Sequence, residues 1–128
     1  MVGLDVTLRT LLTRKETSQW RELNTKAGTA FADIVDYYIE AYEETNPQVP
    51  GCALHDPLAV GVALDPSFIT TLGLNMFVST DKETYGRTIG DQARLDQPET
   101  NVNVGINVDA DRYLATFMKY LTGLFAKN

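Results

Sequence analysis

Two adjacent residues, His55 and Asp56, are the side chains of this protein best suited to chemistry. His55 is the only histidine, and imidazole is the side chain that ordinarily titrates near neutral pH, so it can transfer a proton under physiological conditions. Pro57 and an apolar stretch follow directly. Because proline is favoured in the first turn of a helix, the pattern predicts that the pair lies where a loop turns into a helix. Such a junction can hold catalytic side chains on a rigid element.

The same pattern also has a purely structural interpretation. An aspartate before a proline and an apolar helix is a good N-cap, whose carboxylate accepts hydrogen bonds from backbone N–H groups. Asp56 would then be a cap and His55 a flanking polar residue. On the functional interpretation, His55 donates a proton and Asp56 binds a metal ion. A hard cation such as Ca²⁺ needs several oxygen ligands, so one aspartate cannot complete a site.

Three other groups of residues invite a functional interpretation. Tyr38 and Tyr42 could stack on a base, but aromatic residues at helical spacing more often face a core. Cys52 is the only cysteine, so it forms no internal disulfide, and without a second histidine to activate it we expect a packing residue. The acidic residues between 33 and 44 are spread over a helix face, which is typical of a solvated surface.

Composition limits the classes of protein to consider. The chain has 128 residues, 44% of them hydrophobic, and a net charge of −6. These values fit one folded domain over 1–128, and the acidic balance speaks against nucleic acid as a partner. No apolar run approaches the roughly 20 residues that span a bilayer, and Asp5 interrupts an N-terminus without a basic region. We therefore expect a cytoplasmic protein with no membrane partner.

Hydrophobic periodicity predicts a mixed α/β architecture. The segment 2–12 is predicted to open as a buried strand, and 91–100 to be a loop. The other predicted elements are helices from Thr17 or Ser18 to 23, over 28–45, over 56–64 and from Asp109 or Asp111 onward, with strands over 72–79, 84–90 and 101–108.

Four segments together resemble one known family, the inosine-uridine preferring nucleoside hydrolases. They are Leu-His-Asp-Pro-Leu-Ala-Val at 54–60 with Leu-Asp-Pro at 64–66, Met-Val-Gly-Leu-Asp-Val-Thr at 1–7, Thr-Tyr-Gly-Arg-Thr at 84–88, and Asn-Val-Asp-Ala-Asp at 107–111. Their order and spacing resemble the C-terminal part of that family over essentially the whole chain. The resemblance implies an α/β fold, a C-terminal portion with a mixed sheet of about four strands flanked by helices.

The resemblance also implies an activity. Members of the family cleave the N-glycosidic bond of ribonucleosides, and a bound Ca²⁺ holds the attacking water and the ribose hydroxyls. By motif, His55 matches the proton donor to the departing base and Asp56 matches one calcium ligand. Both roles fit the chemistry of these side chains.

The chain departs from the family by what it lacks. The aspartate-rich segment that supplies most calcium ligands is absent, as are the Asn-Asn and Ala-Glu-Phe-Asn signatures that hold the ribose, and Asp5 stands alone. We therefore expect a fragment that lacks the N-terminal half, binds Ca²⁺ weakly or not at all, and does not hydrolyse inosine or uridine by itself. A ribonucleoside would bind only if a partner chain supplied the missing half. The alternative is a non-catalytic interaction module that forms a homo-oligomer through unpaired strand edges.

Overall fold

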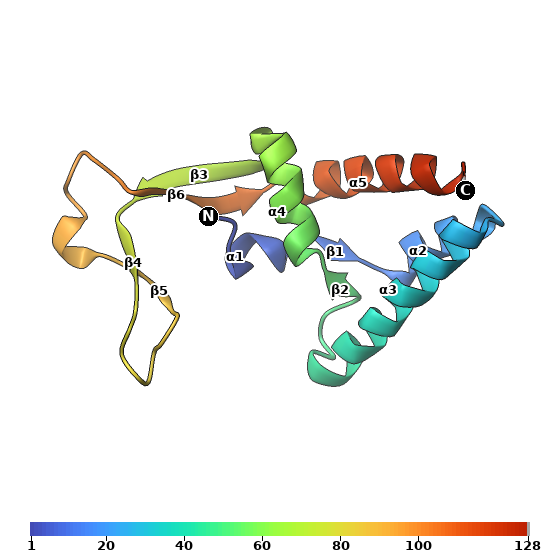
Figure 1. Cartoon of the computed structure of the whole chain (residues 1–128), viewed down its shortest axis with the longest axis horizontal. Helices are drawn as coiled ribbons and strands as arrows, with labels where there is room; N and C mark the ends of the chain where they lie inside the picture. Colours follow the sequence, from blue (N-terminus) through green and yellow to red (C-terminus); the bar gives the residue numbers. More distant parts are fainter. Residues whose placement is uncertain (128) are drawn as a thin grey trace.

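The computed structural model describes residues 1–127 and separates a helical body from a β arm, which we define as residues 69–108 (Figure 1). The helical body contains α2 (Arg14–Glu22), α3 (Lys26–Thr45) and α5 (Ala110–Phe125). The short helix α1 (Leu4–Thr7) and helix α4 (His55–Leu64) lie between the body and the arm. No helix within residues 1–127 is long and apolar enough to cross a membrane.

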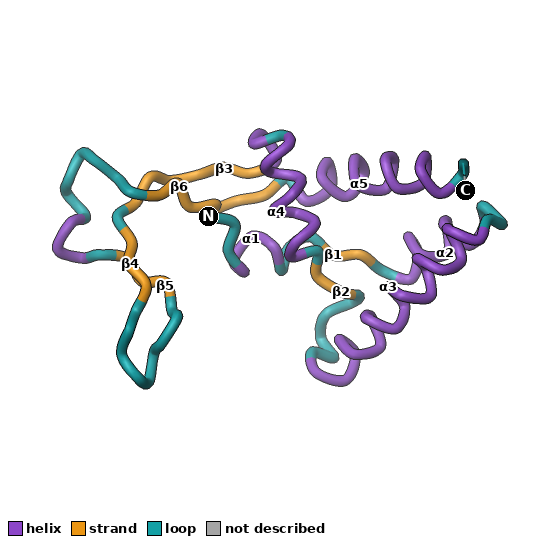
Figure 2. The backbone as a smooth tube through the Cα atoms, viewed as in Figure 1, coloured by secondary structure: helices purple, strands orange, loops and turns teal. Residues whose placement is uncertain are grey.

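All strands assigned within residues 1–127 occur in three antiparallel pairs (Figure 2). The pairs are β1 (Leu11–Leu12) with β2 (Cys52–Ala53), β3 (Ile69–Leu74) with β6 (Val102–Val108), and β4 (Met76–Val78) with β5 (Thr88–Gly90). The α/β class predicted from the sequence is confirmed. The strands form separate two-stranded ladders within the described residues, instead of one sheet of about four strands.

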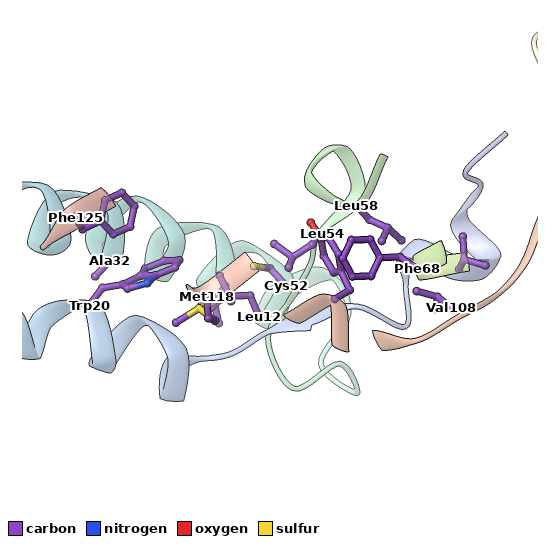
Figure 3. Packing of buried hydrophobic residues seen from close by; sticks show 13 residues of the cluster. Leu12, Trp20, Ala32, Cys52, Leu54, Leu58, Phe68, Val108, Met118 and Phe125 are labelled. Atoms are coloured by element: carbon purple, nitrogen blue, oxygen red, sulfur yellow. The ribbon is translucent and has the colours of Figure 1, made fainter. Parts of the chain in front are cut away.

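The hydrophobic core runs from the helical body to the base of the β arm (Figure 3). At one end Trp20 of α2 packs edge-to-face on Phe125 of α5, with ring centroids 5.3 Å apart. At the other end Phe68 and Tyr113 form a second edge-to-face pair with centroids 5.4 Å apart. Buried residues such as Leu12 and Cys52 lie between these pairs. The core therefore joins α2 and α5 to Phe68, the residue just before the β arm.

The predicted strand at the start of the chain is wrong. Leu4–Thr7 forms one helical turn, in which Thr7 N–H donates to the Gly3 carbonyl at 3.1 Å. Strand β1 covers only Leu11–Leu12. The β-branched residues Val6 and Thr7 are buried, so tertiary packing overrides their strand propensity.

Two further boundaries differ for local reasons. Helix α2 begins at Arg14 because Thr13 is its N-cap: the Thr13 Oγ1 accepts from Lys15 N–H, and Glu16 accepts from Thr13 N–H in a capping box. Neither Thr17 nor Ser18 is the cap. The predicted strand over 72–79 is broken at Asn75, which is buried and whose side-chain amide donates to two backbone carbonyls of the 91–100 loop. Strand β6 and the Asp109 cap of α5 are confirmed.

Helices α2 and α3 are joined by ion pairs centred on Asp36. Its carboxylate accepts from Arg21 at 2.7 Å and from the Thr17 hydroxyl at 2.7 Å, and Arg14 lies 3.9 Å away. Partial burial by itself would raise the pKa of Asp36. The hydrogen bonds from Arg21 and Thr17 and the two positive charges outweigh burial, and the pKa of this carboxyl is lowered below its ordinary value.

We expect this depressed pKa to make stability depend on acid pH. A carboxyl with a lower pKa in the folded state stabilises the fold above its unfolded pKa of about 3.9, and that contribution is lost as pH falls through the folded pKa. The difference in free energy of unfolding between the native chain and Asp36→Asn, measured by urea denaturation, should therefore shrink below about pH 4. A difference that stays constant from pH 7 to pH 3 would contradict the assignment.

Candidate active site

His55 is the first residue of α4, and the backbone around it is fixed by strand pairing. Leu12 of β1 pairs with Cys52 of β2, and the Leu54 N–H donates to the Thr10 carbonyl at 2.9 Å. Gly51 precedes β2 with a φ of +130°, and a Cβ at this position would collide with the Leu12 carbonyl oxygen. Glycine thus permits the close approach that brings α4 against the first ten residues.

Both ring nitrogens of His55 are hydrogen bonded to hydroxyl groups. The Nδ1 lies 2.7 Å from Thr7 Oγ1 in α1, and the Nε2 lies 2.8 Å from Tyr42 Oη in α3. In a neutral imidazole one nitrogen donates and the other accepts, so one hydroxyl accepts from His55 and the other donates to it. In the imidazolium form both nitrogens donate. The two hydroxyls therefore fix the ring plane in either protonation state.

Asp56 does not cap helix α4. The N-cap residue is Leu54, with no side-chain capping hydrogen bond, and Asp56 stands in the first helical turn. Its side chain is exposed, where the helix dipole favours a negative charge. No hydrogen bond or ion pair engages its carboxylate within residues 1–127. The capping interpretation of Asp56 is therefore wrong, and the carboxylate is accessible to an outside group.

The described residues do not by themselves fit a calcium site. No three His, Cys, Asp or Glu side chains within residues 1–127 lie together in a way that could hold a metal ion. Ca²⁺ takes six to eight oxygen ligands, and Asp56 would supply only one carboxylate. Asp5 and Asp109–Asp111 do not join it: Asp5 lies in α1, and Asp109 caps α5 by accepting from Arg112 N–H.

A groove of about 380 Å³ adjoins the histidine. His55, Asp56 and Tyr38 line it together with apolar residues of α2, α3 and α5. The Tyr38 ring packs against Tyr42 with centroids 5.1 Å apart and an interplanar angle of 71°. The groove therefore places an imidazole and a carboxylate beside an apolar wall, a combination found in ligand sites.

Sequence reasoning did not predict the contacts of Thr7 and Tyr42 with His55. Thr7 carries no motif that marks it as a partner of a histidine 48 positions away. Tyr42 is considered for stacking on a base, with a core role favoured, and its 13-residue separation from His55 gives no periodic signal. Both contacts arise from the way α1 and α3 cross the start of α4.

Cys52 takes no part in the site's chemistry. It is 2% exposed, and burial raises the pKa of its thiol to about 11. Because the thiolate is the reactive form, a buried thiol with a raised pKa is a poor nucleophile. The predicted packing role of Cys52 is confirmed.

A histidine held by two hydroxyls at the start of a helix, with a carboxylate beside it, is an arrangement suited to general acid catalysis. Comparison with known proteins identifies the family. A family model described as inosine-uridine preferring nucleoside hydrolase matches residues 1–115. The chain therefore belongs to the inosine-uridine preferring nucleoside hydrolase family.

Individual relatives show how much of that fold is present. An inosine-uridine preferring nucleoside hydrolase from Crithidia fasciculata is 31% identical over 114 residues, which are 88% of this chain and 36% of the relative. The pyrimidine-specific ribonucleoside hydrolase RihA of Salmonella newport is 30% identical, over 89% of this chain and 37% of its own length. The chain thus spans little more than a third of these relatives.

Solved structures confirm the fold. The purine-preferring ribonucleoside hydrolase from Gardnerella vaginalis superposes with a TM-score of 0.94 at 55% identity, and covers 100% of this chain and 40% of its own. A plant nucleoside hydrolase superposes with a TM-score of 0.79 at 22% identity, covering 94% of this chain. These matches favour the assignment of the chain to the nucleoside hydrolase fold over its assignment to an unrelated interaction module.

Proposed function

We propose that this chain contributes the general acid of a ribonucleoside hydrolase active site, with His55 as proton donor to the departing base. The observation that carries the proposal is the clamping of both His55 ring nitrogens by Thr7 and Tyr42 beside an unpartnered Asp56. Hydrolysis of an N-glycosidic bond adds water to the anomeric carbon and breaks the bond to the base nitrogen. The departing nitrogen must take up a proton, and imidazolium can supply it.

The two hydroxyls decide how that proton could leave. Because Thr7 and Tyr42 occupy both ring nitrogens, a proton reaches a bound base either through one of these hydroxyls or after one of them moves aside. Tyr42 is the better placed of the two, since its neighbour Tyr38 lines the groove next to His55. Thr7 would then hold the other ring nitrogen, Nδ1, and keep the orientation of the ring. Thr7 thus acts on the base only through His55, whereas the Tyr42 hydroxyl either relays the proton from His55 or moves aside.

We propose that Asp56 is one ligand of a calcium ion whose other ligands come from residues outside this chain, because the described residues supply only this one free carboxylate beside His55. The proposed partner is the portion of the nucleoside hydrolase fold that the chain does not span. We further propose that the substrate is a ribonucleoside and that the protein acts in the cytoplasm. Self-association of the isolated chain stays a prediction, which sedimentation would test.

Reconstitution tests the proposed function. We define the reconstituted hydrolase as this chain joined at Met1 to the portion of the Gardnerella vaginalis relative that it does not cover. The isolated chain should release no base or ribose from inosine or uridine and should show no calcium binding by titration calorimetry. The reconstituted hydrolase should release base from a ribonucleoside and lose that activity on chelation of calcium. Turnover by the isolated chain, abolished by His55→Ala, would overturn the need for a second portion.

A further inference from the structure

Thr10 is a fully buried polar residue, 0% exposed, between the end of α1 and the start of β1. It is hydrogen bonded in two directions. The Thr10 hydroxyl donates to the Thr7 carbonyl at 2.9 Å, and the Thr10 carbonyl accepts from the Leu54 N–H at 2.9 Å. Thr7 holds the Nδ1 of His55, and Leu54 directly precedes His55 in the chain. Thr10 therefore bonds both to the residue that holds the imidazole and to the residue before it.

The main-chain bond of Thr10 continues the β1–β2 ladder by one residue. Leu11 is opposite Ala53, so Thr10 is opposite Leu54 in the same antiparallel register. The elements α1, β1, β2 and the start of α4 lie together at this point (Figure 1). Because the bond joins two backbones, it does not depend on the side chain at position 10. A substitution there leaves the ladder in place and changes only what the side chain does.

The hydroxyl of Thr10 acts on the last residue of α1. A helix leaves its last carbonyl groups without an intrahelical partner, and α1 has only four residues, too few to be stable alone. The carbonyl of Thr7 accepts from the Thr10 N–H at 3.1 Å and from the Thr10 hydroxyl at 2.9 Å. Two donors on one carbonyl fix the orientation of the Thr7 peptide group. They thereby fix the direction in which the Thr7 side chain projects.

A buried hydroxyl at position 10 is not required for packing, because valine has nearly the same shape and no polar atom. Removing a hydroxyl from water costs free energy that its hydrogen bond only partly returns. Within residues 1–127 the Thr10 hydroxyl makes one hydrogen bond, to the residue that holds His55. Thr7 is itself only 2% exposed, so water does not compete for its contact with Nδ1. The protein alone therefore sets that contact.

We propose that Thr10 is a positioning residue for His55, which it aligns through Thr7. A ring held in one orientation presents Nε2 to Tyr42 at a fixed distance. A Thr7 side chain with more freedom would widen the range of ring orientations and lower the fraction that is aligned for proton transfer. The inference rests on the proposed function only for the effect on turnover, because the alignment of the ring is a property of this chain.

Nuclear magnetic resonance of this chain with ¹⁵N-labelled histidine tests the alignment. His55 is the only histidine, so every ring-nitrogen signal belongs to it. Thr10→Val removes the hydroxyl and keeps the shape. At one fixed pH, its Nδ1 signal should move in the same direction as in Thr7→Val, which removes the contact itself, and by a smaller amount. Thr10→Ser keeps a hydroxyl and should give the native signal.

Thr17→Val is the matched control for this experiment. Thr17 is also buried, at 1% exposed, and its hydroxyl donates to Asp36 between α2 and α3. Within residues 1–127 no hydrogen bond joins Thr17 to His55, so the ring signals should stay at their native positions. Circular dichroism checks that each variant folds, and Thr10→Ala replaces Thr10→Val if the valine chain does not. Native ring signals in a folded chain without the Thr10 hydroxyl, or equal shifts in the Thr17 control, would overturn the proposal.

The reconstituted hydrolase shows the consequence for turnover. Thr10→Val should lower kcat by about 2- to 10-fold, the range that one hydrogen bond contributes. KM should stay within about twofold, because the hydroxyl acts on the alignment of the proton donor. Thr10→Ser should keep kcat within about twofold of the native value. A raised KM with native kcat would contradict the positioning role. An inactive native hydrolase with the expected ring signals would overturn the proposed function and support the alignment.

Discussion

Replacement of His55 by alanine should lower kcat of the reconstituted hydrolase by about 10²- to 10⁴-fold, the range that general acid catalysis contributes. The reason is that the departing base loses its proton donor while the rest of the groove stays in place. KM should change much less, because His55 would act mainly in the transition state. The measurement is steady-state release of base from inosine and uridine at neutral pH.

Two controls separate catalysis from folding in this experiment. Lys119→Ala changes an exposed residue of α5 that makes no contact with the site, so its kcat should stay within about twofold of the native value. The Thr7→Val variant removes one hydroxyl from the His55 ring and should cost less than removal of the ring itself. A His55→Ala enzyme with native circular dichroism and undiminished kcat would refute the assignment of His55.

Replacement of Trp20 by alanine should lower the free energy of unfolding of the isolated chain by about 3–5 kcal/mol. Trp20 is 1% exposed and packs on Phe125 and Phe117, so its removal leaves a cavity between α2 and α5. A loss of this size is a large share of the 5–15 kcal/mol that stabilises a typical domain. Urea denaturation followed by circular dichroism gives the value.

Matched variants distinguish packing from hydrogen bonding at this position. Within residues 1–127 the Trp20 Nε1 has no hydrogen-bond partner. Trp20→Phe therefore loses only ring volume and should cost less than half as much as Trp20→Ala. Tyr37→Ala removes an aromatic side chain that is 76% exposed in α3 and should change stability by no more than about 0.5 kcal/mol. Equal losses for Trp20→Ala and Tyr37→Ala would contradict the described core.

The sequence predicted the helices and strands whose pattern is long and regular. The stripe of α3 and the alternation of β6 were recognised because one face of each packs against the rest of the fold, and that face repeats with the period of its own backbone. Short elements were predicted poorly. Leu4–Thr7 has strand-forming residues but is a helical turn, because a four-residue segment takes the conformation that its neighbours allow.

The sequence by itself determined the family and the pair His55 and Asp56, since a motif of adjacent residues is read directly along the chain. Only the tertiary structure decided that Thr7 and Tyr42 hold the two imidazole nitrogens and that Asp56 is not a cap. It also decided that the Met1 carbonyl accepts from the Gly105 N–H of β6. Those contacts join residues up to 104 positions apart. Their cause is the crossing of packed elements, which leaves no periodic trace in the order of the residues.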